Sequence, residues 1–141
     1  MKPLAIILAF VITFANYNAT AQTEKVLVKT LRTENINSVY VEMSGEIEVK
    51  TWSNDYARIL INIKHNNANP NLMKVLITKG RYSVNPSAED GILTLSSKDL
   101  ETPLVFGNNE TILDETISYT LVVPEGVKVK LKNPDQLVSN D

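Results

Sequence analysis

Hydrophobic and polar residues alternate with a period of two in several stretches of the chain. The clearest stretches are residues 39–43, 46–50 and 59–64. Side chains that alternate in this way lie on opposite faces of a strand, and one apolar and one polar face are typical of half-buried antiparallel strands. Residues 44–45 and 53–55 separate the stretches and are of types that favour turns. Residues 38–64 are therefore predicted to form a three-stranded antiparallel meander.

One segment breaks the alternation. Asn69 and Pro70 precede residues 71–79, and Gly80 follows them. Asn as an N-cap, Pro in the first turn and Gly after the last turn are start and stop signals for a helix. The alternative is a strand over residues 74–79, because Val and Ile favour sheets. The start and stop signals favour the helix.

Four further stretches have the composition of strands. They are residues 26–31, 91–96, 116–123 and 127–132. A turn at residues 124–126, which are Pro, Glu and Gly, joins the last two. The predicted fold class is all-β with minor α. It is either a short β-solenoid or an antiparallel β-sandwich-like sheet, with one short helix near residues 70–79.

The N-terminal segment has the three parts of a secretory signal. Lys2 is followed by an apolar run over residues 4–15, and the small residues Ala, Thr and Ala occupy positions 19–21. The apolar run is too short for a membrane span, which needs roughly 20 residues. We expect residues 1–21 to be cleaved, which leaves residues 22–141 as a single β domain of the common size. A lipid anchor on Cys is excluded, because the chain contains no Cys.

Composition and charge limit the cofactors and partners expected for the chain after removal of residues 1–21. The leader carries one of the 14 basic residues and none of the 16 acidic ones, so its removal changes the net charge from −2 to −3. An acidic chain without a basic patch does not favour a nucleic-acid partner. No Cys and a single His leave too few ligands for most zinc, copper or iron–sulfur sites, so no cofactor is expected. No later segment approaches the length of a membrane span.

Two strand segments resemble a known family. Residues 39–49 read VYVEMSGEIEV and residues 117–129 read ISYTLVVPEGVKV. Both are similar to the adhesin-like β-repeat proteins exported by Bacteroidetes, the auto-transporter adhesin head-like family, a domain of unknown function. The resemblance implies stacked β-turns of a solenoid and an adhesin-like role. It supplies no catalytic residues, and the chain departs from the family because it has only 5 Gly and ends soon after the second segment.

Two groups of residues are candidates for a contact surface. Trp52 ends a predicted strand, where it is either part of the core or an exposed platform for a sugar ring. Core packing is the favoured interpretation, because burial of a Trp side chain is strongly stabilising. Leu104, Val105 and Phe106 form an apolar triplet between Pro103 and a polar loop. The triplet is either an exposed contact or, as we favour, a short strand that packs under a loop.

Clustered carboxylates suggest a calcium site. Glu42, Glu46 and Glu48 lie close together on neighbouring predicted strands and carry the oxygen ligands that Ca²⁺ prefers. A solvated acidic face is the favoured interpretation, because no Asp-rich calcium loop accompanies them. Asp114 and Glu115 precede a strand and are interpreted as turn and solubility residues.

The same carboxylates allow an enzymatic alternative. Glu46, Glu48 or Asp114 could serve as acid and base in sugar cleavage. Such a site needs a cleft with aromatic walls, and the chain has few aromatic residues to build one. His65 lies in a polar stretch and is interpreted as a surface residue rather than a base.

We therefore expect an exported, non-enzymatic β domain in the periplasm, at the cell surface or outside the cell. Its partner would be an unknown protein or glycan at the cell envelope. The alternatives are a carbohydrate-active or other hydrolytic enzyme and an assembly subunit that pairs through an open sheet edge. Lys128, Lys130 and Lys132 alternate with apolar residues, which is typical of an edge strand guarded by charge.

Overall fold

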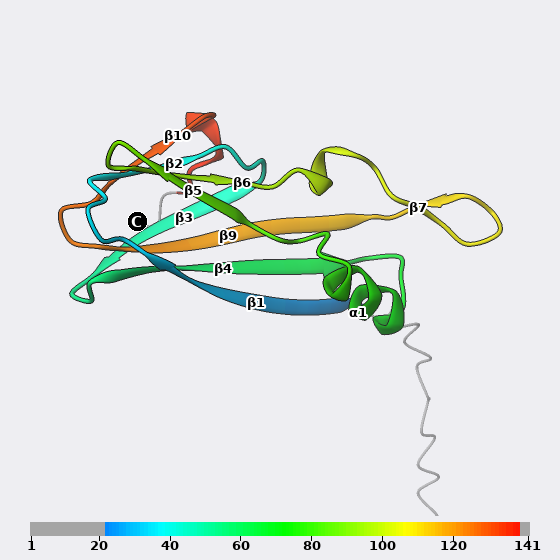
Figure 1. The fold of residues 1–141 in the computed structure, drawn as a ribbon. Helices are drawn as coiled ribbons and strands as arrows, with labels where there is room; N and C mark the ends of the chain where they lie inside the picture. Colours follow the sequence, from blue (N-terminus) through cyan, green and yellow to red (C-terminus); the bar gives the residue numbers. More distant parts are fainter. Residues whose placement is uncertain (1–21, 139–141) are drawn as a thin grey trace, which may run out of the picture.

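The computed structural model describes residues 22–138 and consists mainly of strands (Figure 1). The elements in chain order are β1 (Thr23–Arg32), β2 (Ser38–Val41), β3 (Glu46–Trp52), β4 (Tyr56–His65), α1 (Pro70–Thr78), β5 (Asn85–Glu89), β6 (Ile92–Ser96), η1 (Asp99–Glu101), β7 (Val105–Phe106), β8 (Thr111–Ile112), β9 (Glu115–Pro124), β10 (Lys128–Leu131) and η2 (Pro134–Gln136). The all-β fold class with minor α is confirmed. The expected signal at residues 1–21 lies outside the described residues.

The strands form two four-stranded sheets and one small hairpin. Sheet A has the order β1-β4-β9-β3, and sheet B has the order β10-β2-β6-β5. β7 and β8 pair with each other and extend beyond one end of β9 (Figure 1). Both sheets are mixed: β4 is antiparallel to its neighbours in sheet A, whereas β3 is parallel to β9, and β2 is parallel to both β6 and β10.

The predicted meander over residues 38–64 is wrong. β2 lies in sheet B and β3 in sheet A, and β9 separates β3 from β4. The turn at Gly45 is therefore an arch between the two sheets rather than a hairpin within one. Strands on either side of an arch present their apolar faces to the same core, so they show the same period of two as hairpin strands.

The two predicted architectures both contribute to the observed fold. The chain passes from sheet A to sheet B and back through β1, β2 and β3, and β9 and β10 repeat the first of these steps. β1, β3 and β9 run in the same direction, as they would in the coils of a solenoid. β4 and β5 run against their neighbours and complete two packed sheets, as in a sandwich.

The core lies on one face of sheet A, where the odd-numbered residues of its strands point inward. In β4 every odd-numbered residue from Ala57 to His65 is buried. Sheet B covers this inner face near residues 30–32 of β1. α1 and residues 81–84 cover it at the other end, where Met73 and Tyr82 are buried in the same core. Figure 1 shows α1 beside the ends of β1 and β4 that sheet B does not reach.

The predicted helix is confirmed over Pro70–Thr78. The Asn69 side chain caps it, since its Oδ1 accepts a hydrogen bond from the backbone N–H of Leu72 at 3.0 Å. Met73 and Leu76 are the buried residues of the helix. In residues 22–138 no helix combines the length and the apolar character needed to cross a membrane.

Candidate functional site

The outer face of sheet A carries the first candidate site. Sheet B and α1 lie on the same side of this sheet (Figure 1), and no element within residues 22–138 packs on the opposite side. The even-numbered side chains of β1, β3, β4 and β9 form this open face, because odd-numbered side chains point into the core. An open sheet face can accept an extended ligand without any movement of the backbone.

Trp52, Tyr56 and Arg58 form a cluster at one end of this face. The Trp52 and Tyr56 rings meet edge to face with centroids 4.9 Å apart, and Trp52 Nε1 donates a hydrogen bond to the Tyr56 carbonyl oxygen at 2.7 Å. The Arg58 guanidinium lies over both rings, 5.3 Å and 5.8 Å from their centroids. These three residues are named the Trp52 cluster. All three are half-buried, so Trp52 packs partly against its neighbours and stays partly accessible on the open face.

Strand register places further charged residues beside the Trp52 cluster. Lys50 and Arg58 lie in one row on either side of Val122, and Lys50 Nζ is 3.2 Å from Glu48 Oε1. Asp55 is exposed in the short connection between β3 and β4. The cluster thus combines aromatic faces with cationic side chains, and acidic side chains lie at its border.

The apolar triplet, for which a short packed strand was favoured over an exposed contact, divides into two parts. Leu104 and Phe106 pack against the core, as the short-strand interpretation expects. Val105 is 53% exposed and lies opposite Ile112 of β8, which is 63% exposed. The hairpin precedes the start of β9, whereas Trp52 pairs with the end of β9, about 30 Å away along the strand. Trp52 and the triplet therefore do not form one surface.

The candidate carboxylates are not brought together. Glu46 and Glu48 project from β3 on the outer face of sheet A, and Glu42 follows β2 in sheet B. Asp114 precedes β9 by one residue, which places it about 13 Å along the strand from the register position of Glu46. Within residues 22–138 no group of three His, Asp or Glu side chains has the geometry of a metal site.

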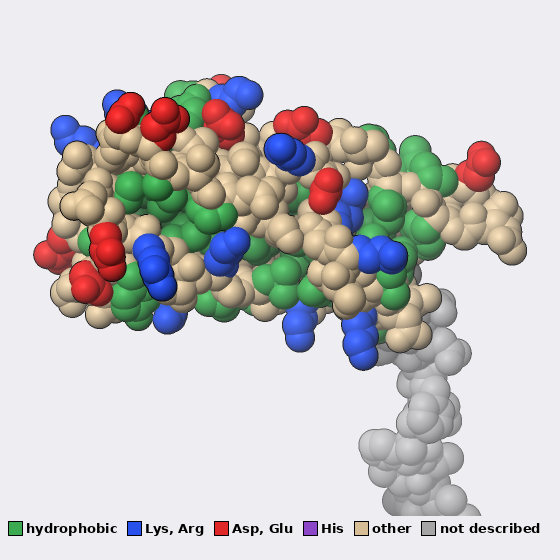
Figure 2. All heavy atoms as spheres, in the orientation of Figure 1, with side chains coloured by type: hydrophobic (Ala, Val, Ile, Leu, Met, Phe, Trp, Pro, Cys, Tyr) green, Lys and Arg blue, Asp and Glu red, His purple; other side chains and the backbone are tan. Residues whose placement is uncertain are grey.

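A groove along the free side of β1 is a second candidate. Three cavities of about 330, 230 and 410 Å³ follow one another from residues 30–32 to residues 23–25 of β1. They lie between β1 and, in turn, sheet B, residues 82–84 and α1. Figure 2 shows hydrophobic side chains gathered between the two layers on this side. This feature is named the β1 groove.

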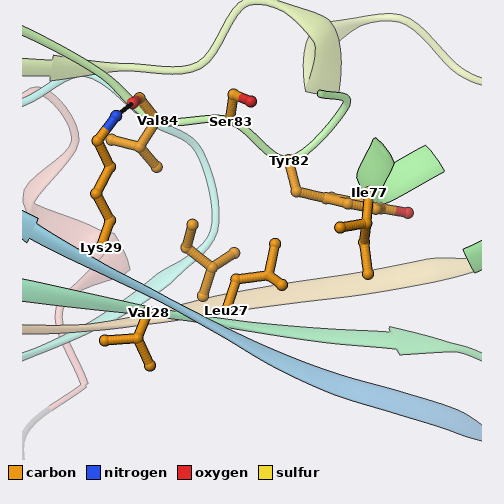
Figure 3. A pocket seen from close by; sticks show the side chains of 8 residues that line it. Leu27, Val28, Lys29, Ile77, Tyr82, Ser83 and Val84 are labelled. Carbon is orange, nitrogen blue, oxygen red and sulfur yellow. Dashed lines mark hydrogen bonds between the residues drawn. The ribbon is translucent and has the colours of Figure 1, made fainter. Parts of the chain in front are cut away.

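The close view of the middle cavity shows how β1 presents its side chains (Figure 3). Leu27 and Lys29 point toward residues 82–84, and Val28 points away from them. The Lys29 ammonium donates a hydrogen bond to the Val84 carbonyl oxygen at 2.7 Å and so spans the β1 groove. The groove is therefore crossed by a charged side chain on the inner face of the edge strand.

The structure contains a buried polar cluster that sequence reasoning missed. It consists of His65, Arg81, Tyr82 and Glu115 and is named the His65 cluster. The Tyr82 hydroxyl donates a hydrogen bond to Glu115 Oε2 at 2.7 Å, and His65 Nε2 lies 2.6 Å from the same hydroxyl. Arg81 forms an ion pair with Glu115 and donates to the carbonyl oxygens of Asp99 and Thr102 at 3.0 and 3.2 Å.

Two expectations from the sequence are wrong at this cluster. His65 is 0% exposed rather than a surface residue, and the Glu115 side chain is 12% exposed rather than a solubility residue. Both continue the odd-numbered, core-facing positions of β4 and β9. The cluster ties the ends of these strands to residues 81–82 and to the loop around η1.

The hydrogen bonds place a proton on Nε2 of His65. Since the single Tyr82 proton goes to the Glu115 carboxylate, the hydroxyl accepts from His65 Nε2–H, and in the neutral ring Nδ1 is then the unprotonated nitrogen. Nδ1 is buried and has no hydrogen-bond partner in the described structure. Burial lowers the pKa of His65, an effect that the Glu115 charge opposes. Burial, with the hydrogen bond to Glu115, raises the pKa of Tyr82. The cluster is buried and inaccessible to a ligand. Its hydrogen bonds hold the ends of β4 and β9 to residues 81–82 and to the loop around η1.

Comparison with known proteins gives distant similarities. No protein-family model and no curated protein match the chain. It is similar to the crystal structures of a "putative adhesin" from Bacteroides fragilis NCTC 9343, with 14% identity and a TM-score of 0.39, and of another from Parabacteroides merdae ATCC 43184, with 14% identity and a TM-score of 0.35. The alignments cover 76% of this chain but only 40% and 35% of the two matched chains. Both TM-scores lie below 0.5, and the adhesin-like family assignment stays a prediction.

The His65 cluster predicts a pH-dependent stability. The lowered pKa means that His65 binds a proton less readily in the folded chain than in the unfolded chain, where its ordinary pKa is 6.5. The unfolded state therefore binds more protons, and stability falls as the pH falls below about 6.5, by at most about 1.4 kcal/mol per pH unit. Urea unfolding at pH 7.5 and 5.5 measures this loss. Because the chain has one His, the loss should be smaller in His65→Gln, and an equal loss would contradict the assignment.

Proposed function

We propose that this chain is an exported, non-enzymatic binding module of the cell envelope, in the periplasm, at the cell surface or outside the cell. Its ligand binds on the outer face of sheet A at the Trp52 cluster. The observation that carries this proposal is the pair of aromatic rings with a guanidinium on an otherwise uncovered sheet face. The secretory features of residues 1–21 support the export.

The chemistry of the Trp52 cluster supports a carboxylated glycan as the ligand. Aromatic rings present flat apolar faces on which sugar rings stack, and arginine binds carboxylates through a planar fork of N–H donors. Arg58 Nε is buried without a hydrogen-bond partner, which costs free energy and suggests a role other than stability. Lys50 in the same row adds a second cation. A uronic-acid polymer offers both sugar faces and carboxylates at regular intervals.

The open shape of the site supports binding rather than catalysis. Hydrolysis of a glycosidic bond requires two carboxyl groups that face each other across the bond. Glu46 and Glu48 project side by side from one strand, Glu48 lies against Lys50, and Asp114 is remote from both. A flat surface with stacking and ion-pairing groups fits a polymer that is held but not cleaved. Val105 of the β7–β8 hairpin stays a separate predicted contact.

Binding to a uronic-acid oligosaccharide tests the proposal. Titration calorimetry should show binding by the wild-type protein, and Trp52→Ala should weaken it at least tenfold, which corresponds to about 1.4 kcal/mol. The loss is expected because the stacking surface is removed while the sheet remains. Thermal unfolding of the same samples checks that Trp52→Ala is folded at the temperature of the titration.

Two controls separate this site from general surface adhesion. Thr116→Ala changes an exposed residue on the same face of sheet A, at the opposite end of β9, and should bind like the wild type. The carboxyl-reduced oligosaccharide, which keeps the sugar rings but lacks the charges, should bind more weakly. Equal affinity of Trp52→Ala and the wild type would reject the site. Equal affinity for both oligosaccharides would reject the acidic ligand.

A further inference from the structure

Three of the four edge strands of the two large sheets are protected against pairing with another chain. The C-terminal segment covers β3, where the Val138 N–H donates to the Ile47 carbonyl oxygen at 2.9 Å. β10 has only four residues and carries exposed Lys128 and Lys130, which confirms the predicted edge strand guarded by charge. β5 contains Pro86, which lacks an N–H. Short strands, lysines and prolines are common means of preventing edge pairing.

β1 is different from the other outer strands. It is ten residues long, and nothing within residues 22–138 pairs with its free side. On its outer face Val26 and Val28 are 50% and 58% exposed. On its inner face lie Lys25 and Lys29. These lysines are of the kind that protects β10, but the Lys29 ammonium is already hydrogen-bonded to the Val84 carbonyl oxygen, so the ten-residue edge with its exposed valines can still accept another strand.

We propose that β1 pairs in antiparallel orientation with β1 of a second copy of this chain, with a two-fold axis at Val28. The two copies of sheet A then form one continuous eight-stranded sheet. In an antiparallel pair, directly opposite side chains lie on the same face of the sheet, so an even-numbered residue must pair with an even-numbered one. The two-fold axis must therefore pass between two copies of the same residue. With Val28 at the axis, Glu24 lies opposite Arg32 of the second copy, and this ion pair occurs twice.

The charges of β1 select this register over its neighbours. An axis at Leu27 would place Lys25 opposite Lys29 of the second copy on the inner face, and it would do so twice. An axis at Lys29 would place two copies of Lys29 opposite each other. Like charges directly opposite in a sheet are destabilising, whereas the Val28 register pairs opposite charges and two valines. The inner lysines thus exclude the two nearest alternative registers.

The contacts of each copy are compatible with this pairing. Lys29 already directs its ammonium to the Val84 carbonyl oxygen (Figure 3), so its alkyl chain can lie against Leu27 of the second copy. Glu24 Oε1 is 3.8 Å from Lys64 Nζ, and the two side chains are 67% and 39% exposed, respectively. The Glu24 carboxylate would therefore lie between Lys64 of its own chain and Arg32 of the second copy.

Charge exchange tests the register. The exported protein, produced with its own leader, should double its molar mass with increasing concentration in sedimentation equilibrium. Glu24→Arg and Arg32→Glu each place like charges opposite each other and should weaken the dimer at least tenfold. The double variant restores two opposite pairs and should recover the dimer. Lys128→Glu on the β10 edge is the matched control and should not alter it. A monomer at all concentrations, or single variants that dimerise like the wild type, would overturn the proposal.

A single introduced thiol locates the axis. The chain has no Cys, so Val28→Cys creates a single thiol that meets its own copy at the axis. Paired strand positions are within disulfide range, and mild oxidation should give a covalent dimer. Thr30→Cys lies on the same strand and face but opposite Val26 of the second copy, so it should give far less. Equal yields from both variants, or none from Val28→Cys, would contradict the Val28 axis.

Discussion

Replacement of Glu115 by Ala should lower the free energy of unfolding by about 3–5 kcal/mol. Glu115 is the carboxylate of the His65 cluster and receives hydrogen bonds from both Arg81 and Tyr82. Without it, the Arg81 cation stays buried without its counter-charge, and the Tyr82 hydroxyl loses its acceptor. Chemical denaturation of the wild type and Glu115→Ala, monitored by circular dichroism, measures the difference.

The neighbouring residue supplies the control for this variant. Asp114 is exposed, and its contact to Asn67 is made by its backbone N–H. Asp114→Ala removes the same charge one position earlier and should change stability by no more than about 0.5 kcal/mol. Adding Arg81→Met to Glu115→Ala removes the stranded cation and should recover part of the loss. If Glu115→Ala were as stable as Asp114→Ala, the cluster would not lock the strand ends.

Replacement of Gly45 by Ala should cost about 2–4 kcal/mol. Gly45 has a φ of +120°, in the region that favours glycine, and forms the arch between β2 and β3. A Cβ at this position would lie 2.8 Å from the backbone carbonyl oxygen of Ile117, which belongs to β9 and cannot move independently. The same denaturation experiment measures the effect.

Gly126 is the control that separates the cost of a positive φ from the cost of the close contact with Ile117. It also has a positive φ, of 88°, but an added Cβ there meets no atom within 4 Å. Gly126→Ala should therefore show only the backbone cost, about 1 kcal/mol. Equal losses in the two variants would mean that the close approach of the arch to β9 contributes nothing to the stability of the fold.

The longer alternating strands and the helix were predictable because they depend on local signals, whereas β5 and β8 lack such alternation and were not predicted. Alternation in residues 59–64 and the Asn69 and Pro70 start signal each reflect interactions within a few residues of the chain. The order of strands in the sheets was not predictable in this way. A turn at Gly45 suits a hairpin and an arch equally well, and the arch depends on a partner far away in the sequence, because β3 pairs with β9, which begins at Glu115.

The candidate site was predicted only in part. Trp52 was recognised as a residue of interest, but its partners Tyr56 and Arg58 were not, because their convergence depends on the turn over residues 53–55. The sequence does carry a signal for the burial of His65 and Glu115. Both continue the odd-numbered apolar positions of their strands, and extending that parity by one step places them inside.

The central position of β9 in sheet A has a consequence for the order in which the protein folds. β9 lies between β4 and β3 but spans residues Glu115–Pro124, late in the chain. Before these residues are available, β1 and β4 can form only a two-stranded ribbon, which is marginally stable on its own. A chain that emerges N-terminus first therefore stays largely unfolded until most of it has been released. Under the export proposed above, this delay would keep the chain unfolded during transport, so that it folds only after it has crossed the membrane.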